Sequence, residues 1–201
     1  MIVRVPLFYR CIYPSLLCRI PTDEKKLFLT FDDGPHPVIT SKVIDLLNQF
    51  NARGTFFCVG ENVKKYPDVF SLLKKQNFAV GNHTFHHLNG FKNSLKKYLH
   101  DVQLADAIID SGLFRPPYGK LSPAQYFRLR QKYTIAMWDV ISYDFDQKIS
   151  KKDCFKYVIR YSRSGSIIVF HDSDKAEKNL LYALPKTLEH FQKRGYVFES
   201  L

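Results

Sequence analysis

Short continuous apolar runs alternate along the chain with longer segments in which apolar residues recur at helical spacing. The short runs are typical of buried strands, and the longer segments are typical of amphipathic helices. The expected strands cover residues 27–32, 55–59, 78–81, 113–115, 134–140, 167–171 and 196–198. The expected helices cover residues 41–50, 94–111, 123–131, 152–162 and 180–194, together with one that begins at Glu61 or Pro67 and ends at Lys75.

This alternation of strands and helices runs through the whole chain without an internal repeat. It predicts parallel strands covered by helices, in either an open α/β sheet or a barrel. The 201 residues suffice for one domain with a sizeable core, and no linker or shift of composition marks a second one. We expect one domain over residues 27–201, with residues 1–26 as an N-terminal extension that packs on it.

The charge balance is strongly basic, since 30 Lys and Arg residues stand against 19 Asp and Glu residues and give a net charge of +11. Such a surface attracts polyanions, for example an acidic glycan or an anionic lipid, although a basic protein without such a partner is an equally good interpretation. Many lysines occur in pairs, which is typical of solvated helix faces. Arginine and aromatic residues do not interleave, so we expect no nucleic-acid partner.

The first twenty residues contain three arginines and two prolines, which interrupt each apolar stretch. No stretch reaches the length of a signal peptide or a membrane span, so we expect neither and take a cytoplasmic location as the default. The four cysteines form no C-x-x-C pair. Cys58 lies in an apolar run and is expected in the core, and a pairing of Cys11 with Cys18 is left open.

Two adjacent carboxylates, Asp32 and Asp33, follow the first expected strand and precede a Gly34-Pro35 turn. Successive side chains of a strand point to opposite faces, so these two carboxylates should point in different directions. One of them can then bind a metal ion while the other accepts a proton.

Four more of the expected strands end in, or lead into, residues that carry chemistry. In parallel α/β architectures the carboxyl ends of the strands lie on one face, where sites are built. The residues that follow the strands are His83, Thr84, His86 and His87, then Arg115 to Gly119, then Trp138, Asp139 and Asp144, and finally His171 and Asp172.

His83 and His87 are four residues apart and would face the same way on a helical turn. With Asp33 they make a set of two histidines and one aspartate, which is typical of catalytic zinc sites that keep a position open. His86 is interpreted as a neighbour of this set rather than a ligand. Three other histidines are assigned to surface or core roles, namely His36, His100 and His190.

Five ordered segments together carry a resemblance to a known family. They are Thr30-Phe31-Asp32-Asp33-Gly34-Pro35, His83-Thr84-x-x-His87, Arg115-Pro116-Pro117-Tyr118-Gly119, Trp138 to Asp144, and Val169-Phe170-His171. They resemble the motifs of the polysaccharide deacetylase family, also called the NodB-homology domain or carbohydrate esterase family four, over about residues 27–198. The resemblance implies a distorted, incomplete (β/α) barrel and a metal-dependent hydrolase that removes acetyl groups from N-acetylated sugars, anionic ones included.

A divalent metal on Asp33, His83 and His87 would activate water and polarise the carbonyl. Zinc is the default for this set, and cobalt, nickel or iron suit the same ligands. Asp32 is then the candidate general base, and the resemblance implies that Arg115 holds it ionised and oriented. The plainer alternative for Arg115 is a surface salt bridge.

The resemblance further implies that His171 is the general acid and that Asp144 orients it, with Asp139 and Asp172 as alternatives. It implies that the backbone N–H of Tyr118 stabilises the oxyanion. The substrate pocket is expected to contain Pro117, Trp138, Phe145 and Val169, although Trp138 suits simple core packing nearly as well. The family has Trp where this chain has Phe145 and Leu where it has Val169. Both positions line the acetyl pocket in the family, so these departures bear on pocket shape.

Three hypotheses follow for the function. The leading one is a metal-dependent deacetylase of an amino-sugar polysaccharide, oligosaccharide or glycolipid. The second is a deformylase or deacetylase of a lipid-linked sugar, which would suit the basic surface. The third, from a different class, is a catalytically silent glycan-binding protein.

Overall fold

Strand β1 (Lys26–Asp32) lies at the centre of the sheet, and every residue of it after Lys26 is buried. The computed structural model describes residues 3–5, 9 and 12–201. On one edge, β1 pairs with β8 (Val197–Glu199) along its first half and with β2 (Thr55–Cys58) along its second half. On the other edge it pairs with β7 (Ile167–His171). All of these pairings are parallel.

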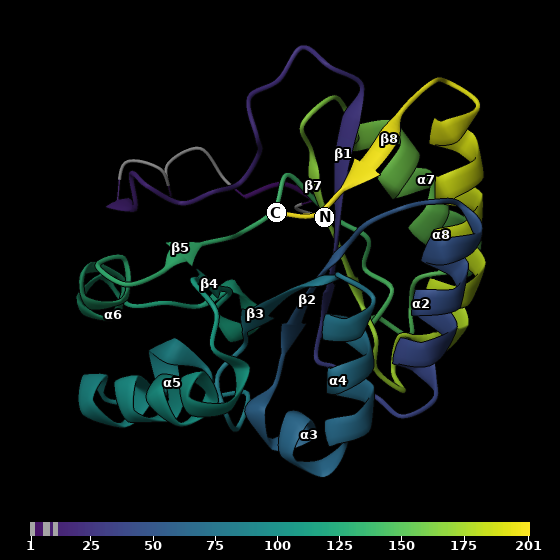
Figure 1. The fold of residues 1–201 in the computed structure, drawn as a ribbon. Coiled ribbons are helices and arrows are strands. Elements are labelled where there is room, and N and C mark those ends of the chain that lie inside the picture. Colours follow the sequence, from purple (N-terminus) through teal and green to yellow (C-terminus); the bar gives the residue numbers. More distant parts are fainter. Residues whose placement is uncertain (1–2, 6–8, 10–11) are drawn as a thin grey trace.

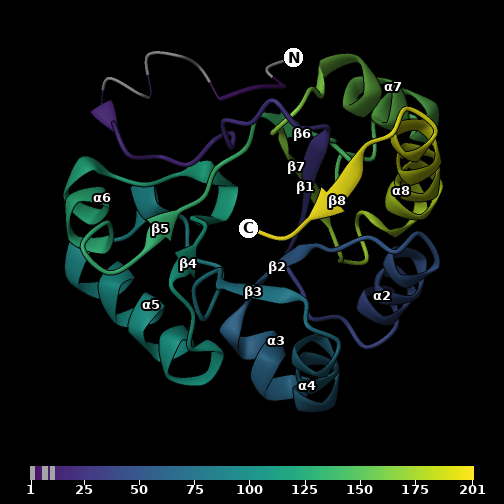
Figure 2. The ribbon, with the colours of Figure 1, turned by 45° about the horizontal axis from the view of Figure 1, so that its top comes forward.

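The other strands extend the sheet on both sides of β1. Beyond β2 lie β3 (Ala79–Asn82), β4 (Leu113–Phe114) and β5 (Thr134–Ile135), and beyond β7 lies β6 (Val140–Ile141). In Figures 1 and 2 the helices surround the curled sheet. They are α2 (Ile39–Gln49), α3 (Gly60–Lys65), α4 (Pro67–Lys75), α5 (Leu95–Ile109), α6 (Pro123–Leu129), α7 (Lys151–Tyr161) and α8 (Glu177–Gln192), with short turns η1 (Gly90–Lys92) and η2 (Pro117–Gly119).

The two ends of this sheet, β5 and β6, do not pair with each other in the part of the chain that the structure describes. Of the two architectures that the pattern allowed, the curled sheet is therefore the incomplete (β/α) barrel, and that prediction is confirmed. All carboxyl ends of the strands face the same rim, because every strand pairing is parallel.

The expected strand over residues 134–140 is wrong. This segment forms two short strands on opposite ends of the sheet, with residues 136–139 crossing between them. The carbonyls of Ala136 and Met137 bind the guanidinium of Arg115 rather than a neighbouring strand. An apolar run has the same appearance in both situations, because a buried crossing segment needs apolar side chains just as a strand does.

The segment before β1 lies across the gap in the barrel, as Figure 2 shows. Leu17 pairs with Ala136 beside β5, and Arg19 pairs with Ser166 just before β7. Tyr13 is buried, and its hydroxyl donates to the carbonyl of Leu121 at 2.7 Å. The N-terminal segment therefore joins the two ends of the sheet. The possible pairing of Cys11 with Cys18 lies outside the described residues, because Cys11 is not among them.

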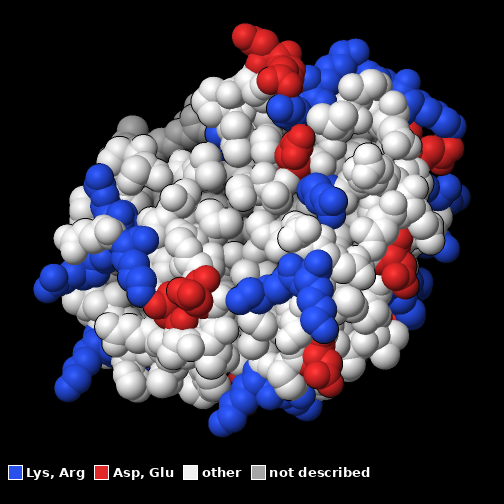
Figure 3. Space-filling view, viewed as in Figure 1, with Lys and Arg blue, Asp and Glu red and all other residues white. Residues whose placement is uncertain are grey.

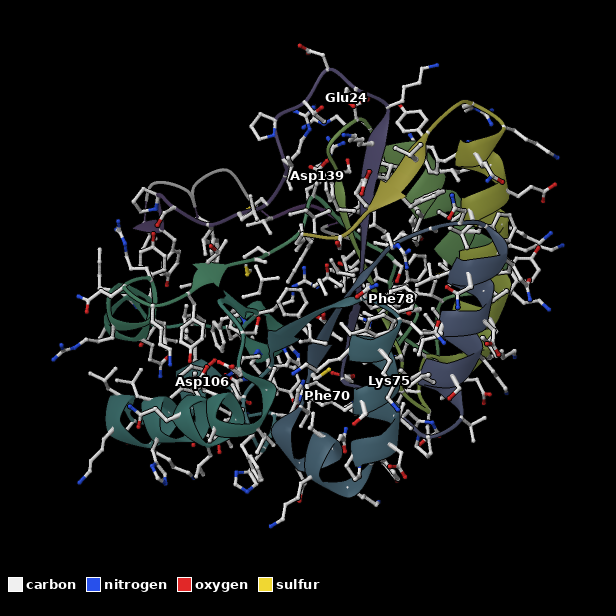
Figure 4. All side chains as sticks on the ribbon, in the orientation of Figure 1. Glu24, Phe70, Lys75, Phe78, Asp106 and Asp139 are labelled. Carbon is white, nitrogen blue, oxygen red and sulfur yellow. The ribbon has the colours of Figure 1, made fainter. Side chains whose placement is uncertain are left out.

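Apolar side chains fill the space between the sheet and the helices. Phe70 of α4 and Phe78, which precedes β3, are two labelled members of this core in Figure 4. Cys58 is fully buried, as expected. Among the described residues, no helix has the length and apolar character needed to cross a membrane.

Candidate active site

Asp32 ends β1 and forms an ion pair with the deeply buried Arg115. The guanidinium donates to Oδ1 of Asp32 at 2.7 Å and to the hydroxyl of Thr30 at 2.7 Å. Arg115 follows β4, has no exposed surface and stacks over the ring of Phe57, with 4.1 Å between its Cζ and the ring centroid. The surface salt bridge considered for Arg115 is thereby excluded. Because its other nitrogens bind carbonyls, this guanidinium holds one oxygen of Asp32 in a fixed position.

Asp33 turns away from Asp32 because the strand stops there. Its φ is +79°, so the divergence comes from a left-handed residue just after β1 and not from the pleat of a continuing strand. Oδ1 of Asp33 lies 3.1 Å from Nε2 of His87 and 3.9 Å from Nε2 of His83. One ligand atom from each of the three residues lies within 4.8 Å of the others.

The two histidines do not converge on a helical turn, as their spacing suggested. The segment after β3 is irregular, and Thr84 and His87 both have positive φ, at +62° and +54°. These two left-handed residues fold the chain back, so that the centroids of the His83 and His87 imidazole rings lie 5.1 Å apart. His86 points elsewhere, with Nδ1 2.5 Å from a carboxylate oxygen of Asp101.

The protonation of His83 and Asp33 suits a divalent cation. Nδ1 of His83 bonds to the carbonyl of Arg115 at 2.7 Å, which leaves Nε2 directed at Asp33. Burial lowers the pKa of His83 to about 4, against the opposing charge of Asp32. Burial of Asp33 raises its pKa, but the hydrogen bond with His87 and the charges of His171 and His83 outweigh this and bring it below its usual value. A neutral imidazole nitrogen and an ionised carboxylate are the forms that bind metal.

His171 ends β7 and is paired with Asp144. Its Nδ1 lies 2.7 Å from Oδ1 of Asp144, and its backbone N–H donates to Oδ2 of the same carboxylate at 2.7 Å. Burial favours neutral His171, but the charge and hydrogen bond of Asp144 dominate and raise its pKa to about 9. The imidazole is therefore protonated at neutral pH.

The two other carboxylates that were considered as partners of His171 bind different groups. Asp139, labelled in Figure 4, accepts from the hydroxyl of Ser166 at 2.7 Å, and its backbone N–H donates to the carbonyl of Ile167 at the start of β7. Asp172 accepts from the backbone N–H of Gly34 at 3.1 Å and from the hydroxyl of Thr40. Burial raises the pKa of Asp172 to about 8. Only Asp144 of the three contacts the His171 imidazole.

A pocket of about 350 Å³ joins these groups. Asp32, Asp33, His83, His87 and His171 face it from one side, and its apolar wall is formed by Trp138, Ile141, Phe145 and Val169. Trp138 is half-buried in this wall. The ring of Phe145 packs on His171 edge to face, with 4.8 Å between the centroids.

Turn η2 forms the remaining wall of the pocket. Tyr118 has φ +59°, its side chain is exposed, and its hydroxyl lies 3.2 Å from Nδ1 of His87. Its dihedral angles are not helical, although the residue lies within the short turn Pro117–Gly119. Pro117, the first residue of this turn, is buried and does not line the pocket.

Among the residues around the pocket that sequence reasoning missed are Thr30, Ser173 and Lys175, together with Lys120 and Ile141, which line it. Thr30 links Arg115 to β7, and its place two residues before Asp32 on the same strand face was a usable signal. Ser173 donates to Oδ2 of Asp33 at 3.3 Å, and Lys175 lines the pocket. Ser173 and Lys175 lie just beyond the end of β7, where nothing in the local pattern distinguishes them from an ordinary loop.

Known proteins resemble this chain along nearly its whole length. The family model described as "Polysaccharide deacetylase" matches residues 19–137. A peptidoglycan-N-acetylglucosamine deacetylase of Bacillus cereus is 31% identical over 192 residues, covering 90% of this chain and 89% of that protein. A chitooligosaccharide deacetylase of Azorhizobium caulinodans is 29% identical, with 91% and 96% covered. The crystal structure of the Bc1960 peptidoglycan N-acetylglucosamine deacetylase superposes with a TM-score of 0.90 at 27% identity, covering 98% of this chain and 95% of that one.

Proposed function

The chain belongs to the polysaccharide deacetylase family, and from this premise we propose that it is a metal-dependent hydrolase that removes N-acetyl groups from an amino-sugar polysaccharide, oligosaccharide or glycolipid. The observation that carries the proposal is the separation of two adjacent carboxylates. Asp32 is held by a buried guanidinium, whereas Asp33 faces two imidazoles, and both face one pocket. Relatives that are named deacetylases of peptidoglycan and of chitooligosaccharides indicate the class of substrate.

Asp33, His83 and His87 are the residues that would hold the cation, since they present one carboxylate and two imidazole nitrogens. A bound divalent metal supplies a Lewis acid that polarises the acetamide carbonyl and acidifies water. Zinc is the metal we propose, and cobalt, nickel and iron suit the same donors.

Asp32 takes the proton from the attacking water in this proposal. Its Oδ1 is engaged by Arg115, so Oδ2 is the oxygen that accepts the proton. The guanidinium also fixes the orientation of the carboxylate before the attack. General-base catalysis of this kind contributes about 10²–10⁴-fold to a rate.

His171 delivers a proton to the departing amine. Asp144 occupies Nδ1, so Nε2 is the atom that donates. The charge of Asp144 raises the pKa of His171 above its usual value, which favours the protonated imidazole that this role requires. The backbone N–H of Tyr118 is the proposed donor to the oxyanion. The apolar wall formed by Trp138, Phe145 and Val169 receives the acetyl methyl group and excludes water from it.

Acetate release across a substrate panel with defined metals tests this function. The panel contains chitin oligosaccharides, peptidoglycan fragments and formylated sugars. Metal-loaded protein should release acetate, Asp32→Asn should lose turnover while it retains metal, and Asp33→Asn or His87→Ala should lose the metal. Normal hydrolysis by metal-free protein or by Asp32→Asn contradicts the mechanism.

The same panel separates the two other hypotheses. A lipid-linked formylated sugar as substrate would show as formate release exceeding acetate release. A silent glycan-binding protein would bind oligosaccharides without releasing acetate. The named relatives favour neither, and both carboxylates, both metal-facing histidines, Arg115 and the His171 pair are all in place.

A further inference from the structure

A second groove, of about 450 Å³, adjoins the active-site pocket, and Lys175 lines both. Five of the residues that line this groove are exposed lysines: Lys148, Lys151, Lys152, Lys175 and Lys178. The groove therefore continues the active site into a strongly cationic surface. Figure 3 shows that Lys and Arg also outnumber acidic side chains on the face seen in Figure 1, so basic charge is not confined to the groove.

The groove is built by two segments that are far apart in the sequence. One is the loop before α7 with the first turn of that helix, and the other is the loop between β7 and the first turn of α8. Gln147 donates to the carbonyl of Lys175 at 2.6 Å, and Asn179 donates to the carbonyl of Ile149 at 3.2 Å. These two hydrogen bonds join the walls, so the lysines are held on one framework.

The lysines lie where helix electrostatics disfavour them. Lys151 and Lys152 occupy the first turn of α7, and Lys178 occupies the first turn of α8. The N-terminus of a helix carries partial positive charge and stabilises anions, so cations in these positions are unfavourable. Their positions therefore do not contribute to helix stability, whereas a bound anion would be attracted by both the lysines and the partial positive charge of the helix N-termini.

Three of the acidic side chains near the groove pair with basic side chains outside it, and a fourth, Asp146, accepts from the backbone N–H of Lys148 at 2.9 Å. Glu177 pairs with Lys42 at 2.8 Å, Asp174 with His36 at 3.2 Å, and Asp153 with Lys156 at 3.6 Å. Within the described part of the chain, none of the five groove lysines has a carboxylate oxygen within 4.0 Å of its ammonium nitrogen. Their charge is therefore available to a ligand.

We propose that this lysine groove binds carboxylate or phosphate groups carried by sugars next to the one that is deacetylated, so that the preferred substrate is an anionic glycan. This inference rests on the proposed deacetylase function and extends it. Because Lys175 belongs to both the pocket and the groove, a polymer with its acetamide in the pocket extends directly along the lysines. Charge on the neighbouring sugars then strengthens binding without entering the chemistry.

The test compares three oligosaccharides of matched length. One is a neutral chitin oligosaccharide, one carries the carboxylates of N-acetylmuramic acid, and one carries phosphate groups. The variant Lys152→Gln with Lys178→Gln is compared with Lys74→Gln with Lys75→Gln, which removes the same charge from exposed positions of α4 outside the groove. The groove variant should lower kcat/KM on the anionic substrate about tenfold more than on the neutral one, through KM, since two exposed charge interactions are lost.

Each outcome decides the proposal. A loss confined to the groove variant and suppressed by added salt supports it, and the substrate that shows the loss identifies carboxylate or phosphate as the ligand. An equal loss in both variants assigns the preference to overall charge and overturns the groove. Wild-type protein that hydrolyses neutral and anionic substrates equally also overturns it. Failure to release acetate from any of the three substrates contradicts the deacetylase function itself. This outcome is therefore distinguishable from a failure of the groove proposal alone.

Discussion

His83 and His171 are both histidines at the carboxyl rim of the sheet, and both lie near carboxylates. Yet the pKa of His83 is lowered to about 4, and that of His171 is raised to about 9. The difference lies in the partner of Nδ1. In His83 this atom bonds to a neutral carbonyl, that of Arg115, whereas in His171 it bonds to the carboxylate of Asp144.

This comparison shows how one rim can hold two imidazoles in opposite protonation states. A buried imidazole with a carbonyl partner stays neutral and offers Nε2 as a lone pair. A largely buried imidazole in an ion pair stays protonated and offers Nε2 as a donor. The first is suited to hold a cation and the second to protonate a leaving group.

Deleting each histidine should produce different losses, and these are the largest effects we expect. His83→Ala should lose bound metal, and acetate release should then disappear. His171→Ala should retain its metal and release acetate about 10²–10⁴-fold more slowly, because only the proton donor is missing. Metal content by mass spectrometry, together with acetate release, separates the two. Equal metal content in both variants would contradict the assignment of His83.

Asp144→Asn removes the charge that keeps His171 protonated while it preserves the size of the side chain. We expect kcat to fall about 10²-fold and the alkaline limb of the pH profile to move to lower pH. The control is Asp146→Asn, a neighbouring carboxylate that accepts from the backbone N–H of Lys148 at 2.9 Å. A profile that keeps its alkaline limb in Asp144→Asn would show that another group is the acid.

The His171–Asp144 pair should also make stability depend on pH. Because the pKa in the folded protein, about 9, exceeds the usual value of 6.5, the contribution is complete below about pH 6.5 and is lost as pH rises through 9. The shift corresponds to roughly 3 kcal/mol. Urea unfolding of metal-free wild type and His171→Gln at about pH 6 and about pH 9.5 measures it. Metal-free protein is needed because a bound cation lowers this pKa. A difference between the two proteins that does not change with pH contradicts the pairing.

The smallest effect is expected away from both histidines, at Val169. This side chain is buried in β7 and forms part of the apolar wall. Val169→Leu adds one methylene group, so it should disfavour an N-propionyl substrate relative to an N-acetyl one by up to about tenfold. The ratio of kcat/KM on the two substrates measures this, with metal content and pH profile as controls. An equal change on both substrates would place Val169 outside the acyl site.

Much of the fold could be predicted from the chain because its strands are local signals. The run over residues 27–32 differs from β1 by one residue at its start, and residues 167–171 coincide with β7. Residues 134–140 were misassigned because an apolar run does not reveal whether its backbone binds a strand or a guanidinium. That distinction depends on Arg115, which lies about twenty residues earlier in the chain.

The sequence by itself determined which residues reach the rim, because strand ends are set by where apolar runs stop, as at Asp32, and parallel pairing brings those ends together. Only the tertiary structure decided how they divide into a metal-facing set and a proton donor. Asp144, rather than Asp139 or Asp172, is the carboxylate that contacts the imidazole of His171. The left-handed backbone at Asp33 and His87 turns these two metal-facing side chains toward the pocket. Protonation depends on burial and on contacts within a few ångströms, and such contacts join residues that the sequence keeps far apart.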